Sequence, residues 1–231
     1  MEKDLYIIGA GGFAREVCFL IKEINQFSLD NGKYLIKGFI DIKNIGESIM
    51  LGKEKYTILS EDNFVSGSAN SSAHMAIGTA NPIFVKKIIE KFGDRYDFPN
   101  LIHPNVIGNF EHIAMGKGNI IAAGCIFTTS IKIDSYNVIN IGSTIAHDVE
   151  IGSFNIINPR TNISGGVRVG DSNIFGTNST VIQYLEIGEN TTIAAGAVIT
   201  KSIEDDSIML GNPAKLFMKK RRNHYPYTPR S

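Results

Sequence analysis

The residues best suited to chemistry in this chain are a histidine and an aspartate side by side, His147 and Asp148. An imidazole titrates near neutral pH and can take a proton from a nucleophile as a general base. A neighbouring carboxylate can hold one imidazole tautomer, as acids do in catalytic triads. A solvated surface turn carries the same pair equally well, so these residues alone leave both interpretations open.

A second candidate site is a GxGxxA pattern near the N-terminus, followed about thirty residues later by an aspartate. Gly9, Gly11 and Gly12 permit a tight turn, and the helix predicted after Phe13 presents free backbone N–H groups to an anion. Asp41, at the end of the next predicted strand, can accept hydrogen bonds from a nucleoside. The pattern predicts a phosphate-binding turn, with a ligand-free glycine turn as the alternative.

The elements around these residues follow from their hydrophobic patterns. Segments 5–8, 35–41 and 73–78 predict buried strands, and segments 15–25 and 82–92 predict helices, the second with a proline in its first turn. Strands alternating with helices indicate a parallel α/β sheet.

The second half of the chain has a strict six-residue period over residues 113–202. At an apolar frequency of 43%, a run this long arises by chance roughly a few times in a million. Six residues make one short strand and a bend, and three such units make a triangular coil. The repeated large apolar residues are Met115, Ile121, Phe127, Ile133, Ile139, Ile145, Ile151, Ile157, Ile163, Val169, Phe175, Val181, Ile187, Ile193 and Ile199.

Fifteen such units predict five coils and a prism roughly 24 Å tall. The position after each apolar residue is expected to need φ > 0, where Gly, Asn and Asp are least strained. It holds Gly116, Asp134, Asn140, Gly152, Asn158, Gly170, Gly176 and Gly188. Small residues two places before the apolar one are expected to suit a tight corner: Asn119, Cys125, Asn137, Ser143, Asn155, Thr161, Asn173, Ser179, Thr191 and Ala197.

The composition narrows the class of protein. Lys+Arg and Asp+Glu are equal, at 23 each, which argues against a general nucleic-acid or anionic-membrane binder. The two cysteines provide no disulfide framework, and the five histidines form no metal-ligand pattern. No signal peptide or membrane-length apolar run is apparent, so we expect a cytoplasmic protein without membrane insertion.

Several motifs, taken in order, resemble the sugar O-acyltransferase family of the NeuD/PglD type over residues 4–218, within the hexapeptide-repeat acyltransferase superfamily. The hexapeptide repeat alone indicates the superfamily, and its combination with the glycine-rich first domain is more specific. The motifs are NLIHP at 100–104, NIG at 140–142, AHD at 146–148, GGV at 165–167 and GNPAK at 211–215.

The resemblance implies an α/β Rossmann-like βαβ domain followed by an all-β left-handed parallel β-helix. We expect a small nucleotide-sugar-binding domain over 1–100 and a connection with the first coil over 101–112. The β-helix acyltransferase domain is expected over 113–205, and a C-terminal cap with a basic tail over 206–231.

The resemblance also assigns roles to residues. It makes His147 the general base with Asp148 as its partner, and places Asn140 in the active-site groove. It lets the Gly165 N–H face the acetyl carbonyl and puts Pro213 near the adenine end of CoA. For Asn140 and Gly165, backbone conformation is the competing explanation. The nucleotide sugar is expected on the glycine-rich domain, and acetyl-CoA between the β-helices of a homotrimer.

Two residues depart from the family pattern. Many relatives have a second histidine that helps to bind the acetyl thioester, where this chain has Ile156. Relatives also often carry a second acid after the first, where this chain has Ile42. These differences leave open how the thioester is bound and which nucleotide is recognised.

The leading hypothesis is acetyl-CoA-dependent N-acetylation of a nucleotide-linked amino sugar in bacterial surface glycan synthesis, without a metal. The alternatives are O-acetylation of sialic acid or a related nonulosonic acid, and a non-catalytic β-helix scaffold. A nicotinamide oxidoreductase is disfavoured, because about 100 residues provide only one mononucleotide-sized half.

Overall fold

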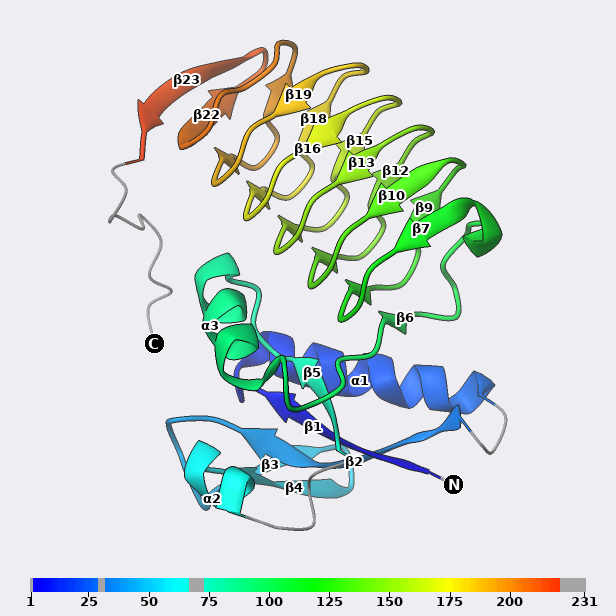
Figure 1. The fold of residues 1–231 in the computed structure, drawn as a ribbon, viewed down its shortest axis with the longest axis vertical. Helices are drawn as coiled ribbons and strands as arrows, with labels where there is room; N and C mark the ends of the chain where they lie inside the picture. The colour runs from blue at the N-terminus through cyan, green and yellow to red at the C-terminus, as the bar shows by residue number, and fades with distance from the viewer. Residues whose placement is uncertain (1, 29–31, 67–72, 221–231) are drawn as a thin grey trace. The chain divides into compact units, whose positions relative to one another are not determined.

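The computed structural model describes residues 2–28, 32–66 and 73–220. The chain divides into two compact units, residues 1–105 with 117–123, and residues 106–116 with 124–231. The first unit is α/β and the second is a repeat of short strands, so the predicted order of the two folds is confirmed (Figure 1).

The first unit is built on a five-stranded sheet with the strand order β3-β4-β2-β1-β5. Its predicted strands and helices are all present. The predicted elements are β1 (Lys3–Ile8), α1 (Gly12–Phe27), β2 (Tyr34–Ile40), β5 (His74–Ile77) and α3 (Pro82–Phe92). The unit also contains β3 (Ser48–Leu51), β4 (Glu54–Leu59), α2 (Glu61–Ser66), β6 (Leu101–Ile102) and β8 (Ile120–Ile121).

The sheet is parallel from β4 to β5, as predicted, but β3 runs antiparallel to β4. The β3–β4 hairpin was not predicted. It turns through Gly52, whose φ of +64° suits glycine. Its outer strand alternates exposed and half-buried residues, which is a weaker pattern than the continuous apolar run of a buried strand such as β1.

Helix α1 packs on β1, β2 and β5 through one apolar face. The buried residues of that face recur at helical spacing: Ala14, Val17, Cys18, Leu20 and Ile21. Burial raises the pKa of the Cys18 thiol, which is an inert part of this core.

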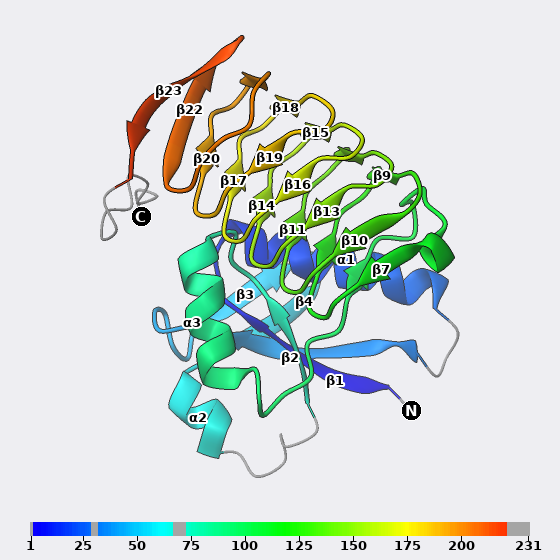
Figure 2. The ribbon, with the colours of Figure 1, turned by 45° about the horizontal axis from the view of Figure 1, so that its top comes forward.

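The second unit is a prism of stacked short strands (Figure 2). Its strands are β7 (Ile113–Met115), β9 (Ile126–Phe127), β10 (Ile131–Ile133), β11 (Val138–Ile139), β12 (Thr144–Ile145), β13 (Glu150–Ile151), β14 (Ile156–Ile157), β15 (Asn162–Ile163), β16 (Arg168–Val169), β17 (Ile174–Phe175), β18 (Thr180–Val181), β19 (Glu186–Ile187), β20 (Thr192–Ile193) and β21 (Val198–Ile199).

Each strand pairs in parallel with the strand one coil further on. Ile145 pairs with Ile163, and Ile151 pairs with Val169, so one coil is 18 residues. The successive strands form three faces, β7-β10-β13-β16-β19, β9-β12-β15-β18-β21 and β11-β14-β17-β20-β22. All the predicted inward residues are buried except Met115, which is half-buried. Each buried side chain of this size stabilises the fold by about 1.5–3 kcal/mol.

The expected position of the left-handed corner residue was wrong by two places. Positive φ occurs at the third residue after the inward one, not the first. The left-handed residues are Gly118, Gly124, Ser130, Tyr136, Gly142, Asp148, Phe154, Arg160, Gly166, Ser172, Asn178, Tyr184, Asn190 and Gly196.

The glycines at the predicted position are explained by close packing of neighbouring coils and not by a positive φ. A Cβ at Gly152 would lie 2.3 Å from the Oδ1 atom of Asp171, and a Cβ at Gly188 would lie 2.3 Å from the Oδ1 atom of Asp205. Neighbouring coils therefore approach too closely at these corners for a side chain, whatever the value of φ.

The small residues two places before the inward ones are all buried, and several form a polar ladder inside the prism. The Oδ1 atom of Asn137 accepts from the Asn155 N–H at 2.8 Å, and that of Asn155 accepts from the Asn173 N–H at 2.9 Å. Asn173 in turn accepts from the Thr191 N–H at 2.7 Å. The ladder satisfies buried backbone donors that the turns leave without a strand partner.

The prism ends in an antiparallel hairpin of β22 (Ser207–Gly211) and β23 (Ala214–Lys219), with β22 continuing one face. Lys220 follows, and burial lowers its pKa to about 8. The remaining residues of the expected basic tail, 221–231, lie outside the described residues.

Replacing Asn155 by alanine is expected to destabilise the prism strongly. The change removes the acceptor of the Asn173 N–H and the donor to Asn137, which are fully buried, so we expect a loss of about 2–3 kcal/mol. Urea unfolding followed by circular dichroism measures it. Asn162→Ala is the control, because Asn162 is exposed and its loss is expected to cost under about 1 kcal/mol. Equal losses in the two variants would contradict the ladder.

Candidate active site

His147 and Asp148 lie in the turn between β12 and β13, on the outside of the prism. The Nδ1 atom of His147 is 2.9 Å from the Oδ2 atom of Asp148, and the two side chains are 51% and 64% exposed. Asp148 is the left-handed residue of this turn, with φ of +59°, a conformation that aspartate tolerates better than most residues. The contact holds the imidazole by Nδ1 and leaves Nε2 without a hydrogen-bond partner among the described residues.

Gly165 lies one coil further along the prism than His147, and the imidazole of His147 packs against its backbone. A Cβ at Gly165 would lie 2.5 Å from both the Cε1 and the Nε2 atoms of the ring. The left-handed residue of this turn is the next one, Gly166, with φ of +67°, so backbone conformation does not explain the glycine at 165. The missing side chain makes room for the imidazole of His147.

The backbone beside this imidazole carries a hydrogen-bond donor. The Gly166 N–H donates to the carbonyl oxygen of His147 at 2.8 Å. The Gly165 N–H has no acceptor among the described residues, as at the equivalent position of the other coils. A free N–H beside the Nε2 atom is the arrangement that an oxyanion requires.

Three other predicted site residues lie elsewhere on the same chain. Asn140 lies at a different corner, after β11, with its Oδ1 atom accepting from the Ile141 N–H at 2.7 Å. Its φ is not positive, so the backbone explanation expected for it was wrong. Ile156 is buried in β14, on a different face from β12, and Pro213 is exposed in the turn between β22 and β23. One chain does not bring these residues to His147.

The first unit holds a cavity of about 470 Å³ at the carboxyl ends of β1 and β2. Asp41 lies here and binds the glycine-rich turn, its Oδ2 atom accepting from the Ala10 N–H at 2.7 Å. Its Oδ1 atom accepts from the N–H groups of Ile42 and Lys43 at 2.7 and 3.0 Å. Asp41 therefore shapes the cavity wall, a structural role that its place in the sequence did not reveal.

The glycines of the first unit have separate roles. A Cβ at Gly9 would lie 2.9 Å from the Gly78 carbonyl oxygen, and φ is +109°, so Gly9 is required by the fold. Gly11 is the N-cap of α1, and a Cβ there would meet nothing within 4 Å. Gly12 is similarly open, and Phe13 follows it in the first turn of α1. The space above Gly11 and Gly12 allows a ligand to approach the helix N-terminus.

Helix α3 contributes cationic and aromatic side chains to this cavity that sequence reasoning missed. Phe84, Lys87 and Lys91 line it, and Phe84 is 52% exposed. Lys91 pairs with Glu61, whereas the exposed Lys87 has no carboxylate partner among the described residues. The available signal was the spacing of 84, 87 and 91, which places the three residues on one helix face.

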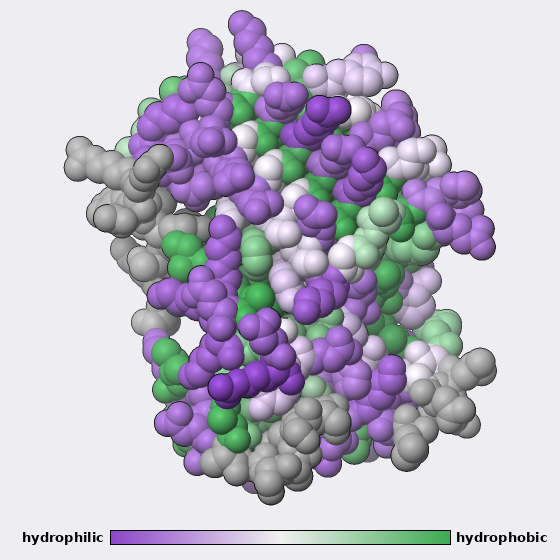
Figure 3. All heavy atoms as spheres, viewed as in Figure 1, coloured by the Kyte–Doolittle hydropathy of each residue, from purple (hydrophilic) through white to green (hydrophobic). Residues whose placement is uncertain are grey.

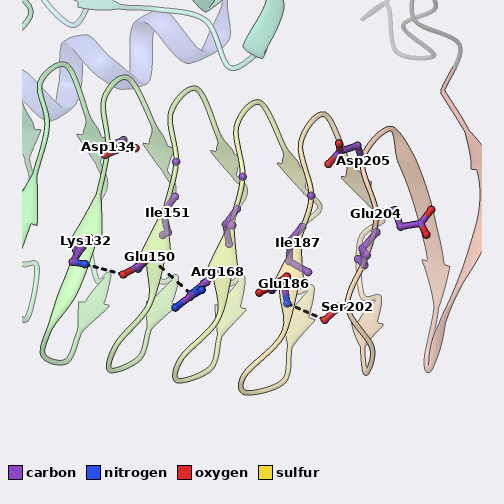
Figure 4. Close-up of a pocket in the computed structure, with 15 residues that line it drawn as sticks. Lys132, Asp134, Glu150, Ile151, Arg168, Glu186, Ile187, Ser202, Glu204 and Asp205 are labelled. Atoms are coloured by element: carbon purple, nitrogen blue, oxygen red, sulfur yellow. Dashed lines mark hydrogen bonds and ion pairs between the residues drawn. The ribbon is translucent and has the colours of Figure 1, made fainter.

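A larger concavity of about 810 Å³ lies along the face β10-β13-β16-β19 (Figure 4). Lys132 binds Glu150 at 2.8 Å, and Arg168 lies 3.9 Å from the same carboxylate. The hydrogen bond and charge of Lys132, with the charge of Arg168, lower the pKa of Glu150.

Acids outnumber bases along this concavity. Beyond Glu150 it is lined by Asp134, Glu186, Glu204 and Asp205, against the two cations Lys132 and Arg168. An acidic surface disfavours a polyanionic ligand. On the visible face in Figure 3, polar and apolar side chains intermingle over the prism. The larger concavity is thus poorly suited to a phosphate-bearing ligand.

The described residues contain no group of three or more His, Cys, Asp or Glu side chains placed to hold a metal ion. In the same part of the chain, no helix is both long and apolar enough to cross a membrane.

Comparison with known proteins agrees with this organisation. The PglD N-terminal domain family matches residues 4–92. PerB from Caulobacter crescentus, solved with CoA and GDP-perosamine, is 23% identical, with a TM-score of 0.81 over 92% of this chain and 96% of its own. No curated protein sequence matches significantly.

Two other solved structures share the fold over almost the whole chain. The acetyltransferase domain of PglB from Neisseria gonorrhoeae FA1090, solved with acetyl coenzyme A, is 22% identical, with a TM-score of 0.80 over 94% of this chain and 100% of its own. WeeI from Acinetobacter baumannii AYE is 25% identical, with a TM-score of 0.80 over 93% and 100%.

The chain therefore shares the fold of these solved structures, in which an α/β domain is followed along the chain by a β-helix of stacked short strands. More particularly, its first domain matches the PglD N-terminal domain family, in agreement with the family that the motifs of the chain resemble.

Gly165→Ala is expected to disable the site without unfolding the protein. The new Cβ would displace the imidazole of His147, and a misplacement of about 1 Å can cost on the order of 10²-fold in rate. Because φ at Gly165 is not positive, the free energy of unfolding is expected to change by less than about 1 kcal/mol. Steady-state kinetics and urea unfolding of the same sample measure the two effects.

The neighbouring variant Gly166→Ala is the control. Its backbone is left-handed, so we expect a loss of about 1–2 kcal/mol in stability together with activity. Wild-type kcat in Gly165→Ala would show that the observed imidazole position is not the working one.

Proposed function

We propose that this protein transfers the acetyl group of acetyl-CoA to the amine of a nucleotide-linked amino sugar, with His147 as general base. The observation that carries the proposal is the imidazole of His147, held by Asp148 and lying over Gly165 beside a free N–H. PerB, solved with CoA and GDP-perosamine, and structures of the same Caulobacter enzyme with one histidine replaced, support the assignment.

The proposed reaction uses each of these groups in turn. The sugar amine attacks the thioester carbonyl while the Nε2 atom of His147 removes its proton. Asp148 stabilises the resulting imidazolium, and the Gly165 N–H donates to the oxyanion of the tetrahedral intermediate. Collapse of the intermediate breaks the C–S bond, and the imidazolium returns its proton to the CoA thiolate, which leaves as the thiol.

The cavity of the first unit is the proposed nucleotide-binding site. The open backbone over Gly11 and Gly12 and the unpaired cation Lys87 suit phosphate groups. The exposed ring of Phe84 offers an apolar surface to a base or sugar. The larger acidic concavity on the prism has no comparable cationic excess.

The proposed setting is bacterial surface glycan synthesis by a homotrimer. Support comes from the exposure of His147 and Asp148 and from the uninterrupted repeat, which provides no loop of its own to cover them. Neighbouring subunits would supply the second wall of the acetyl-CoA groove and bring Asn140 and Ile156 near His147.

Acetyl transfer is tested by mixing the protein with acetyl-CoA and a panel of UDP-, dTDP- and GDP-linked amino sugars. We expect thiol release with at least one sugar and a loss of about 10²–10⁴-fold in kcat for His147→Ala. Mass spectrometry after hydroxylamine treatment identifies the product, because amides survive and esters are cleaved. A labile product would instead support O-acetylation, and the absence of turnover with the whole panel would favour the scaffold.

Lys87→Ala is expected to raise KM for the nucleotide sugar about tenfold, with KM for acetyl-CoA nearly unchanged. The reason is the loss of an unpaired cation at the phosphate site, which removes binding in the ground and transition states alike. Lys53→Ala is the control, because Lys53 is an exposed cation in the β3–β4 turn, away from the cavity. Similar effects in both variants would remove the cavity from the site.

A further inference from the structure

Tyr184 lies in the turn between β18 and β19, one coil beyond Gly166, and is 70% exposed. A Cβ at Gly166 would lie 2.4 Å from the Cδ1 atom of Tyr184 and 2.6 Å from its Cε1 atom. The phenol ring therefore rests on the bare backbone of Gly166, in the same way that the imidazole of His147 rests on Gly165.

The two rings are held beside consecutive residues of one turn. Adjacent Cα atoms lie about 3.8 Å apart, so His147 and Tyr184 flank a short strip of backbone without side chains. The strip is tied to both coils, since the Gly166 N–H donates to the His147 carbonyl and the Tyr184 N–H donates to the Gly165 carbonyl at 2.9 Å. The Gly165 N–H, at the end of the strip next to His147, has no acceptor among the described residues.

The contacts of the fold give little reason for a tyrosine at this position. Its φ of +60° is disfavoured for a bulky side chain, and glycine occupies the equivalent place at Gly142, Gly166 and Gly196. The ring gains little from burial, and its hydroxyl has no partner among the described residues. A ligand packed against the strip would contact the ring of Tyr184, which the rest of the protein leaves exposed.

We propose that Tyr184 is a positioning residue for the acyl donor, packing against the thioester so that its carbonyl lies between His147 and the Gly165 N–H. The inference rests on the proposed function and deepens it. A thioester is flat and uncharged, and it needs one donor and an apolar surface, which this strip supplies.

The nucleotide phosphates have their proposed place in the first unit, which leaves the acyl donor as the phosphate-bearing ligand beside Tyr184. The positions equivalent to His147 in successive coils are Thr129 on one side, and Gly165, Gln183 and Lys201 on the other. Tyr184 lies on the Lys201 side, where the exposed cation suits the phosphates of an acyl-CoA. A donor oriented in this way passes its thioester end across Tyr184 to reach His147.

Steady-state kinetics of matched variants test the assignment. We expect Tyr184→Ala to raise KM for acetyl-CoA about tenfold and to change KM for the nucleotide sugar by less than about twofold. Tyr184→Phe keeps the ring and is expected to behave like the wild type. Phe154→Ala is the control, because Phe154 has the same left-handed place at another corner, stacked on Tyr136. An unchanged KM for acetyl-CoA, or a rise for the sugar alone, would overturn the proposal.

A binding readout separates this inference from the proposed function. The chain contains no tryptophan, so Tyr184→Trp places a single indole over Gly166. Adding acetyl-CoA is expected to shift its emission, whereas the indole of Phe154→Trp is expected not to respond. Emission from Tyr184→Trp that stays constant with saturating acetyl-CoA refutes the inference even if the wild type transfers acetyl groups. A shift in the emission without turnover of any sugar would support the role of Tyr184 and would contradict the proposed acceptor.

Discussion

The stacking of one inward side chain on its equivalent 18 residues later is the constraint on which this structure depends. It brings Ile145 onto Ile163 and Ile163 onto Val181, and the corners between the faces follow in the same register. A change of one residue in that register would turn the inward set outward, because strand side chains alternate. The same register places Gly165 directly above His147. The same register therefore sets both the core of the prism and the position of Gly165 relative to His147.

The repeat constrains the inward residues and leaves the corner residues free to differ, and His147 and Asp148 lie at one of the corners. Their left-handed residues range from Gly166 to Asp148 and Tyr184, each held by backbone hydrogen bonds to the neighbouring coils. A rigid prism can hold such residues, because the strands on either side leave the turn little freedom to relax. The imidazole over Gly165 and the phenol over Gly166 use this rigidity, since two bare residues let two rings from different coils lie close to the backbone.

The two units divide the proposed work between them according to charge. In the first unit an open helix N-terminus and an unpaired Lys87 provide a place for phosphates, while Asp41 is engaged with the backbone of the glycine-rich turn. On the prism, acids outnumber the two cations Lys132 and Arg168 along the larger concavity. Cavity size alone would point to the prism face, and charge points instead to the smaller cavity and to the His147 corner.

The sequence by itself determined the prism, the α/β unit and the pairing of His147 with Asp148. A strict six-residue period and a pair of adjacent residues can be recognised in a sequence, because both depend on residues that are close along the chain. The sequence did not reveal the weakly patterned β3–β4 hairpin, nor that the left-handed residue is the third after each inward one. Only the tertiary structure decided that Gly165 makes room for an imidazole, that α3 lines the cavity of the first unit, and that Tyr184 lies over Gly166. Each of these contacts joins residues from different coils or elements, and what a side chain meets there depends on packing that a local pattern does not encode.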